Sequence, residues 1–231
     1  VWYGGTDYYG YDGAITNQRY GSYNPYNANI SINHSTLNDN GGGGAIYLGS
    51  KSEISGILTI LNSVIQNNSN VGVQVYSGFP VTIDNSTIIG NSNLGIYVNT
   101  SSSLVLTNSI LNNNNGRAAE LHISSGNTLT LLGNQGYNNL NNAIYLDGTF
   151  NNITLSPQGS LVYQFGNLIV PSDKTVSLQS GSVVKFSLEA ALLVSGTLNG
   201  TGTADCPVVF TSIIDDRSEE HTSELQSRQS I

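Results

Sequence analysis

The 231-residue sequence has little charge, few sulfur-containing residues and no long apolar run. It contains no Met and a single Cys, Cys206, which excludes an internal disulfide. Seven Lys and Arg stand against fifteen Asp and Glu, for a net charge of −8. The basic residues form no cluster, so we predict no nucleic-acid partner, because phosphates are bound through grouped Lys and Arg. No apolar stretch approaches the roughly 20 residues of a membrane-spanning helix, so no membrane span is predicted. Because the chain starts at Val1 and lacks Met, we expect it to be a fragment of a longer product.

Gly, Asn, Ser and Thr are abundant instead, and short apolar patterns recur between them with a regular period. One pattern returns at Ile46, Val73, Ile96, Leu121 and Ile144, in steps of 27, 23, 25 and 23 residues. A second begins at Ile30, Leu58, Val81, Leu104, Leu129 and Ile153, and a third contains Leu37, Ile65, Ile88 and Leu111. In each pattern apolar and polar residues alternate, which is typical of β-strands with one buried face.

Three such short runs in each unit of about 24 residues predict a solenoid rather than a sandwich of hairpins. Each unit would make one coil, and each strand would pair in parallel with its equivalent one coil away, at ~4.8 Å. The fold class expected is therefore all-β: a single-stranded parallel β-helix with three short strands per coil.

The repeat also carries a family resemblance. The unit "apolar-x-apolar-x-Asn-Ser-x-Ile-x-x-Asn…Gly-Ile-x-Val" resembles the right-handed parallel β-helix repeat, the fold shared with pectate lyases. The resemblance covers about residues 28–155 and implies a right-handed coil. It leaves function open, because this scaffold hosts both enzymes and passive proteins.

Asn residues occupy two fixed places in the repeat, which we interpret as corners between strands. Asn40, Asn68, Asn91 and Asn114 share one place, and His34, Asn62, Asn85 and Asn108 share the other. Asn tolerates the left-handed backbone conformation, and stacked Asn side chains can pass amide hydrogen bonds from coil to coil. We therefore predict structural Asn ladders at Asn62, Asn85, Asn108, Asn68, Asn91 and Asn114.

The repeat and its interruptions divide the chain into three parts. Residues 1–158 are expected to form the parallel β-helix, with an irregular Tyr-rich loop at 6–27 that is either a binding loop or a poorly ordered bulge. Residues 159–216 resemble segments of large bacterial secreted or surface proteins that introduce fresh coils, so they are expected to start a following β-helix unit. Residues 217–231 read RSEEHTSELQSRQSI, which resembles a translated sequencing-library adapter, and we expect this tail to be non-native.

Catalytic groups are scarce, and one coil holds the only candidates that lie together. Arg117, Glu120 and His122 lie within six residues, and Asp147 follows one coil later. In a polysaccharide lyase, Arg117 or His122 would be the base that abstracts a proton, and carboxylates could hold Ca²⁺. The alternative interpretation is a set of solvated loop charges. We predict no metal site and no cofactor, with Ca²⁺ considered only under the lyase alternative.

The outward position of the first pattern suggests a binding surface. Read from coil to coil, it gives Tyr47, Gln74, Tyr97, His122 and Tyr145. Tyr rings stack on sugar C–H surfaces, and rings two coils apart would lie ~10 Å from each other, comparable to a disaccharide. This series is either a flat glycan-binding stripe or an exterior ladder whose side chains stabilise the sheet by packing on each other.

Together these patterns predict a non-catalytic extracellular or cell-surface module that acts as a rigid stalk, with adhesion or glycan binding. Its expected partner is a polysaccharide or cell-surface glycan. The first alternative is a polysaccharide lyase-like enzyme whose site lies partly outside the fragment. The second is a purely structural spacer without a ligand.

Overall fold

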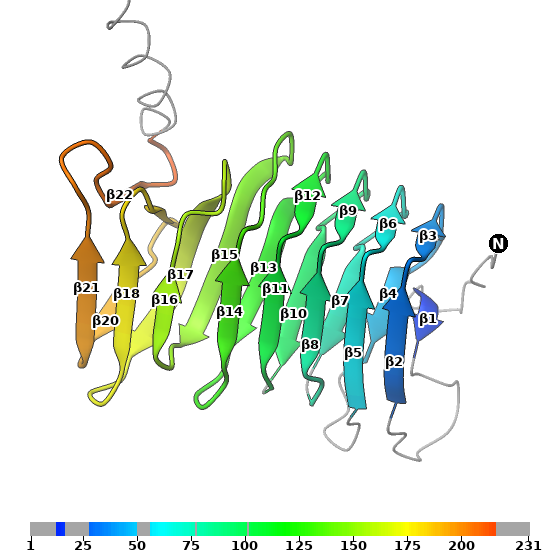
Figure 1. Cartoon of the computed structure of the whole chain (residues 1–231), viewed down its shortest axis with the longest axis horizontal. Helices are drawn as coiled ribbons and strands as arrows, with labels where there is room; N and C mark the ends of the chain where they lie inside the picture. The colour runs from blue at the N-terminus through cyan, green and yellow to red at the C-terminus, as the bar shows by residue number, and fades with distance from the viewer. Residues whose placement is uncertain (1–12, 17–27, 50–55, 77, 101, 216–231) are drawn as a thin grey trace, which may run out of the picture.

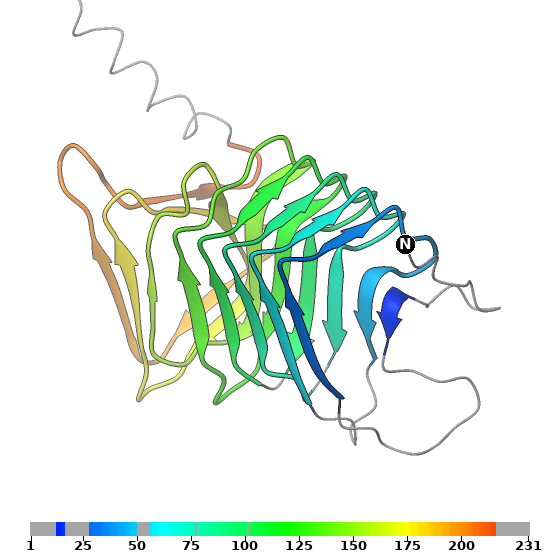
Figure 2. The same cartoon turned by 45° about the vertical axis from the view of Figure 1, so that its right-hand side comes forward.

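The strands of the protein pair only in parallel and stack coil after coil along one axis (Figures 1 and 2). The computed structural model describes residues 13–16, 28–49, 56–76, 78–100 and 102–215, and these statements refer to them. No helix in this part of the chain is long and apolar enough to cross a membrane. The predicted all-β parallel solenoid is confirmed.

Sheet A is the longest sheet and receives a strand from every coil. Its strands in spatial order are β1 Gly13–Thr16, β4 Gly44–Leu48, β7 Val73–Tyr76, β10 Ile96–Thr100, β13 Arg117–Ile123, β15 Asn141–Thr149, β17 Val162–Val170, β19 Val183–Phe186 and β22 Val209–Ser212, and β20 Leu192–Val194 also pairs with β17. Strand β1 lies inside the segment 6–27 that was predicted to be an irregular loop. It forms because Gly-Ala-Ile at its start repeats Gly-Ala-Ile at the start of β4, with which it pairs. The other residues of that segment lie outside the described part of the chain.

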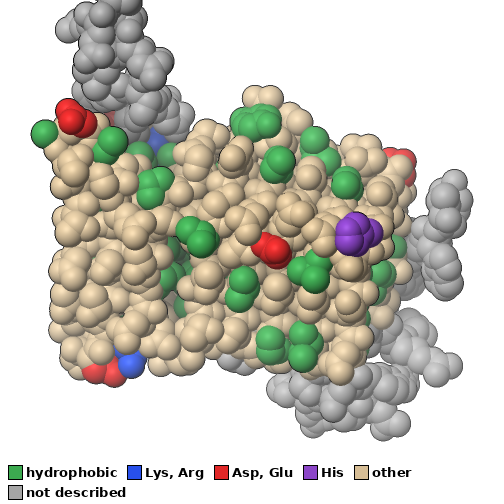
Figure 3. Space-filling view, in the orientation of Figure 1, with side chains coloured by type: hydrophobic (Ala, Val, Ile, Leu, Met, Phe, Trp, Pro, Cys, Tyr) green, Lys and Arg blue, Asp and Glu red, His purple; other side chains and the backbone are tan. Residues whose placement is uncertain are grey.

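Two further sheets complete the coils of the first half. Sheet B contains β2 Ala28–Asn33, β5 Gly56–Leu61, β8 Val81–Asp84, β11 Leu104–Thr107 and β14 Leu129–Leu132, and sheet C contains β3 Thr36–Asn38, β6 Val64–Gln66, β9 Thr87–Ile89 and β12 Ile110–Asn112. The face of the molecule formed by these strands carries few charged side chains (Figure 3). The core lies between the sheets, where residues of one predicted column, such as Ile65 and Ile88, are fully buried and directly stacked.

A fourth sheet replaces sheets B and C in the second half of the described chain. Sheet D contains β16 Ile153–Leu155, β18 Thr175–Gln179 and β21 Thr197–Thr201. Strand β16, which carries Ile153, lies next to β14 in the stack, where the predicted column continues, but its pairing partner is β18 and not β14 (Figure 1).

Sheet A continues without a break in pairing across the domain boundary predicted at residues 158 and 159. Strand β17, which follows this boundary, pairs with β15 on one side and with β19 on the other. The cross-section of the coil does change near the boundary, because β12 is the last strand of sheet C and β14 is the last strand of sheet B. The division into two units stays a prediction.

The first corner of each coil uses a left-handed backbone. His34, Asn62, Asn85 and Asn108 have φ angles of 48°, 49°, 47° and 50°. Gly133 occupies the same place in the next coil, with φ 68°. Asn and Gly adopt this conformation with less strain than other residues, which explains why the corner is conserved along the repeat in residue type. The exposed Asn side chains also join neighbouring coils, since Nδ2 of Asn85 donates to Oδ1 of Asn62 at 2.7 Å.

The second corner contains a buried amide ladder. Its members are Asn40, Asn68, Asn91, Asn114 and Asn139. At each step Oδ1 of one Asn accepts from both the backbone N–H and the Nδ2 of the Asn one coil earlier; Asn91 accepts in this way from Asn68 at 3.2 and 2.8 Å. The left-handed residues of this corner are their neighbours, for example Asn67 and Asn113. Asn therefore serves two separate purposes at adjacent positions.

A second buried ladder was not predicted. The backbone N–H of Ser63 donates to Oγ of Ser86, and the backbone N–H of Ser86 donates to Oγ of Ser109, both at 3.2 Å. Asn134 and Gln158 continue the series in the next two coils with longer side chains. Because Ser is common throughout this sequence, its recurrence at this corner did not indicate a ladder. The only signal was the recurring dipeptide Asn-Ser.

Candidate functional site

The outward side chains of sheet A form two parallel rows over the middle coils. The first row in strand register is Tyr47, Gln74, Tyr97, Glu120, Tyr145 and Gln164. The second row, two residues further along each strand, is Tyr76, Asn99, His122 and Asp147. Alternate residues between them, such as Val75 and Val98, are buried in the core, so both rows point away from it.

The sequence predicted that His122 lies in the same row as Tyr97. In the structure Glu120 is the residue opposite Tyr97. The residue opposite Ile96 is Ala119, so the predicted alignment was displaced by two residues. A displacement by two leaves every side chain on its correct face, because side chains alternate with a period of two. The apolar alternation alone could not reveal the error.

Five rings from the two rows nevertheless form one continuous series, which we call the ring ladder. It consists of Tyr47, Tyr76, Tyr97, His122 and Tyr145. Successive ring centroids lie 6.0, 5.2, 5.4 and 6.0 Å apart. The ladder alternates between the rows, so that each ring of one row contacts rings of the other row on neighbouring coils. Tyr76 was missed in the sequence because only the central position of each strand was read.

The ring ladder is a zigzag rather than the flat stripe that was predicted. Neighbouring rings are inclined to each other by 48° to 62°. Tyr47 is buried and the other four rings are half-buried. Burial raises the pKa of Tyr97 above its ordinary value, so its hydroxyl stays protonated and able to donate. Gln74, the predicted member without a ring, donates from Nε2 to the hydroxyl oxygen of Tyr76 at 2.7 Å.

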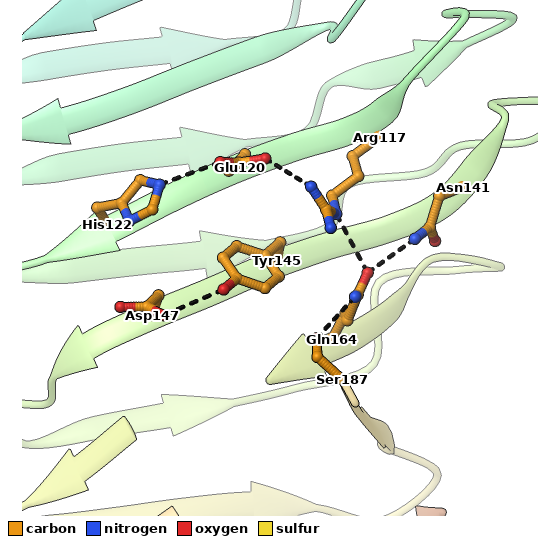
Figure 4. Close-up of polar contacts among 8 residues, drawn as sticks. All are labelled: Arg117, Glu120, His122, Asn141, Tyr145, Asp147, Gln164 and Ser187. Atoms are coloured by element: carbon orange, nitrogen blue, oxygen red, sulfur yellow. Dashed lines mark hydrogen bonds and ion pairs between the residues drawn. The ribbon is translucent and has the colours of Figure 1, made fainter. Parts of the chain in front are cut away.

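The three catalytic candidates predicted from the sequence lie side by side on β13 (Figure 4). Nη1 of Arg117 donates to Oε2 of Glu120 at 2.7 Å, and Nε2 of His122 lies 3.1 Å from Oε1 of the same carboxylate. Because a carboxylate only accepts, Nε2 of His122 carries the proton in this contact. The hydrogen bond from His122, together with the charge of Arg117, holds the pKa of Glu120 below its ordinary value.

Gln164 joins this cluster to the next coils. Its Oε1 accepts from Nε of Arg117 at 3.2 Å and from Nδ2 of Asn141 at 2.7 Å, and its Nε2 donates to Oγ of Ser187 at 2.8 Å (Figure 4). Gln164 is buried, and the guanidinium of Arg117 also lies over the ring of Tyr145, 4.6 Å from its centroid. Arg117 is thus held on three sides by neighbouring side chains.

Asp147 ends the second row beside the last ring. Its Oδ2 accepts from the hydroxyl of Tyr145 at 3.0 Å and from the backbone N–H of Asn167 at 3.2 Å. Burial, and next the hydrogen bond to Asp147, raise the pKa of Tyr145 to about 12. The phenol is therefore a donor at any physiological pH.

The site offers aromatic rings, hydroxyls, amides and the two carboxylates of Glu120 and Asp147. Within the described ranges, no three His, Cys, Asp or Glu side chains lie together in a way that could hold a metal ion. The Ca²⁺ considered under the lyase alternative stays a prediction, because Ca²⁺ also takes backbone and Asn or Gln carbonyl oxygens as ligands. The arrangement suits contacts with a polar ligand over several coils.

One comparison with known proteins gives a match. A family model described as a right handed beta helix region matches residues 15–157. None of the curated proteins and none of the solved structures matches the chain. The matched residues include all five members of the ring ladder.

Proposed function

The chain belongs to the right-handed β-helix family, and from this premise we propose that it is a non-catalytic extracellular or cell-surface module, a rigid stalk whose ring ladder contacts a polysaccharide. Support for the stalk comes from the two buried ladders, which tie every coil of the first half to the next through side-chain hydrogen bonds. Such bonds add directional links to the parallel sheets and resist bending of the stack.

The observation that carries the glycan proposal is the length of the ring ladder. Its five rings pass over five successive coils, from β4 to β15, without interruption. Rings in the same row two coils apart, such as Tyr97 and Tyr145, are separated by ~10 Å, the scale of a disaccharide. Half-buried Tyr side chains present an apolar edge and a hydroxyl together, which is the combination that sugar rings require.

Replacing rings tests this proposal. We expect affinity gels containing polysaccharide to retard the wild-type chain and not the double variant Tyr97→Ala/Tyr145→Ala. The matched control is Thr59→Ala/Thr82→Ala, two outward positions paired with each other on sheet B. Unchanged migration of the Tyr variant, with wild-type circular dichroism and melting temperature, would contradict the proposal and leave the ladder as a stabilising exterior or the module as a spacer.

A polysaccharide lyase is the second candidate, favoured by the meeting of Arg117, Glu120 and His122 on one strand with Asp147 on the next. In that case His122 is the better base, because Arg117 is engaged by Glu120 and Gln164. The test is the ultraviolet absorbance of an unsaturated uronate product. Turnover by the wild-type chain that disappears in His122→Ala would establish the enzyme, and no product from a panel of polyuronates would remove it.

A further inference from the structure

The charges beside the ring ladder decide which glycans it can accept. On the five strands that carry the ladder, the charged side chains are Arg117, Glu120 and Asp147. Counting His122 as neutral at pH 7, one positive and two negative charges leave a net charge of −1 on this surface. The whole chain also carries a net negative charge, −8 at pH 7.

Arg117, the single Lys or Arg on these five strands, is already engaged. Arg117 donates to Glu120 at 2.7 Å and to Gln164 at 3.2 Å, and its guanidinium stacks on Tyr145. Glu120, which is also held by His122, balances the charge of Arg117 at 2.7 Å. The pair therefore offers no net positive charge that would attract an acidic sugar.

The remaining negative charge is placed next to a ring of the ladder. Asp147 accepts from the hydroxyl of Tyr145 and from a backbone N–H, and no described Lys or Arg forms an ion pair with it. A uronate unit lying on Tyr145 would bring its own carboxylate close to this one. Repulsion between the two carboxylates opposes binding of the uronate. A neutral sugar experiences no such repulsion, and one of its hydroxyls can donate a hydrogen bond to Asp147.

We propose that the ring ladder binds an uncharged polysaccharide and excludes polyuronates. This inference rests on the proposed glycan-binding function and specifies the ligand class of the same surface.

The test uses affinity gels made with hydroxyethyl cellulose as the uncharged probe and with polygalacturonate as the acidic probe, both at low ionic strength. We expect the wild-type chain to be retarded only by the uncharged probe. Asp147→Asn should strengthen interaction with polygalacturonate by about threefold, since removing one charge at ~6 Å in water changes the energy by ~0.7 kcal/mol. Asp205→Asn is the matched control: it removes the same charge at an exposed site in the loop after β21 and should leave migration in the acidic gel close to wild type.

The outcomes separate the two proposals. Retardation of the wild-type chain by polygalacturonate as strong as that by hydroxyethyl cellulose would overturn the exclusion of acidic glycans while glycan binding itself stands. An equal effect of Asp147→Asn and Asp205→Asn would also overturn it, because the exclusion would then come from net charge alone. Absence of retardation by every polysaccharide tested would remove the glycan-binding function and this inference with it.

Discussion

The coils before and after residue 158 share sheet A but hold their interiors together in different ways. Before it, the corners contain two buried polar ladders in which each side chain bonds to its equivalent one coil away. Across and after it runs an aromatic series that starts at the buried Phe150, continues through Phe165 and Phe186 and ends at the exposed Phe210, with centroids 5.9, 5.9 and 6.4 Å apart. The contacts that join neighbouring coils are thus side-chain hydrogen bonds in the first half and contacts between aromatic rings in the second.

The difference shows what each solution requires. A buried polar ladder needs a hydrogen-bonding side chain at a fixed place in every coil, so Asn returns throughout one ladder, and Ser gives way only to Asn134 and Gln158 in the other. An aromatic ring is stabilised by filling space and contacting apolar neighbours, so the residues around it can vary more from coil to coil than those around a buried amide. In agreement, the polar residues buried in the second half, Gln164, Ser182 and Lys185, belong to three different types, whereas the amide ladder of the first half is uniform.

The largest effect is expected from the aromatic series. Phe165 is fully buried and contacts the rings before and after it, so Phe165→Ala should lower the free energy of unfolding by about 4 kcal/mol. Because coils interact mainly with their neighbours, hydrogen exchange should accelerate in β17 and β19 and remain slow in β5 and β8. Uniform acceleration through all coils would contradict a difference between the halves.

The buried amide ladder should come next. Asn91→Leu leaves the backbone N–H and Nδ2 of Asn68 without their acceptor and removes one of the two donors to Oδ1 of Asn114, which should lower the free energy of unfolding by about 3 kcal/mol. Urea denaturation measures it. The control is Ser182→Ala in the second half, which removes one hydrogen bond, to the carbonyl of Leu155, and should lower it by about 1 kcal/mol. If the two variants lose the same free energy of unfolding, the ladder does not make the hydrogen bonds of Asn91 more stabilising than an isolated buried hydrogen bond.

The exposed corner should respond more weakly. Asn85 has φ 47°, so Asn85→Ala should lower the free energy of unfolding by about 1 kcal/mol through backbone strain. Asn85→Gly should stay within a few tenths of a kcal/mol of wild type, as Gly133 at the equivalent place suggests. If both variants lose the same amount, the side-chain hydrogen bond to Asn62 and not the left-handed backbone governs the corner.

The smallest effect is expected from pH. The pKa of Glu120 is lowered in the folded chain, first by the hydrogen bond from His122, so its contribution is complete above the ordinary value of 4.5 and is lost as pH falls through the lowered value. We expect a loss of at most about 1 kcal/mol, because the carboxylate is partly exposed. Melting temperatures of wild type and Glu120→Gln should differ at pH 6 and approach each other at pH 3. A constant difference would contradict this linkage.

Much of the fold could be predicted because the repeat is regular. The columns of apolar residues gave the parallel coils, and the positions of Asn62, Asn85 and Asn108 indicated left-handed corners. The match of the family model confirms the right-handed β-helix. The strand of Ile153 lies next to β14, but a three-residue alternating strand carries no information about which neighbour it pairs with, so the pairing of β16 with β18 alone could not be predicted.

The site could be predicted only in part. Tyr47, Tyr97, His122 and Tyr145 do meet in one series, but the row containing Tyr97 continues through Glu120. Ala119 hid this register, because a small residue does not stand out among the Ile and Val that precede it in the column. The engagement of Arg117 by Gln164, 47 residues away, depends on three-dimensional packing that no local pattern contains.

The central claim, that successive coils lie over one another in register, can be measured directly with spin labels. Ser31, Thr59, Thr82, Val105 and Thr130 form one outward column of sheet B. In a Cys206→Ser background, paired Cys labels at Ser31 and Val105 and at Ser31 and Thr130 report separations of three and four coils by pulsed electron resonance. Coils stacked in register place the two backbones ~14 Å apart in the first pair and ~19 Å apart in the second, a rise of ~4.8 Å per coil. Equal distances for the two pairs, or a shorter one for the more distant pair, would contradict it.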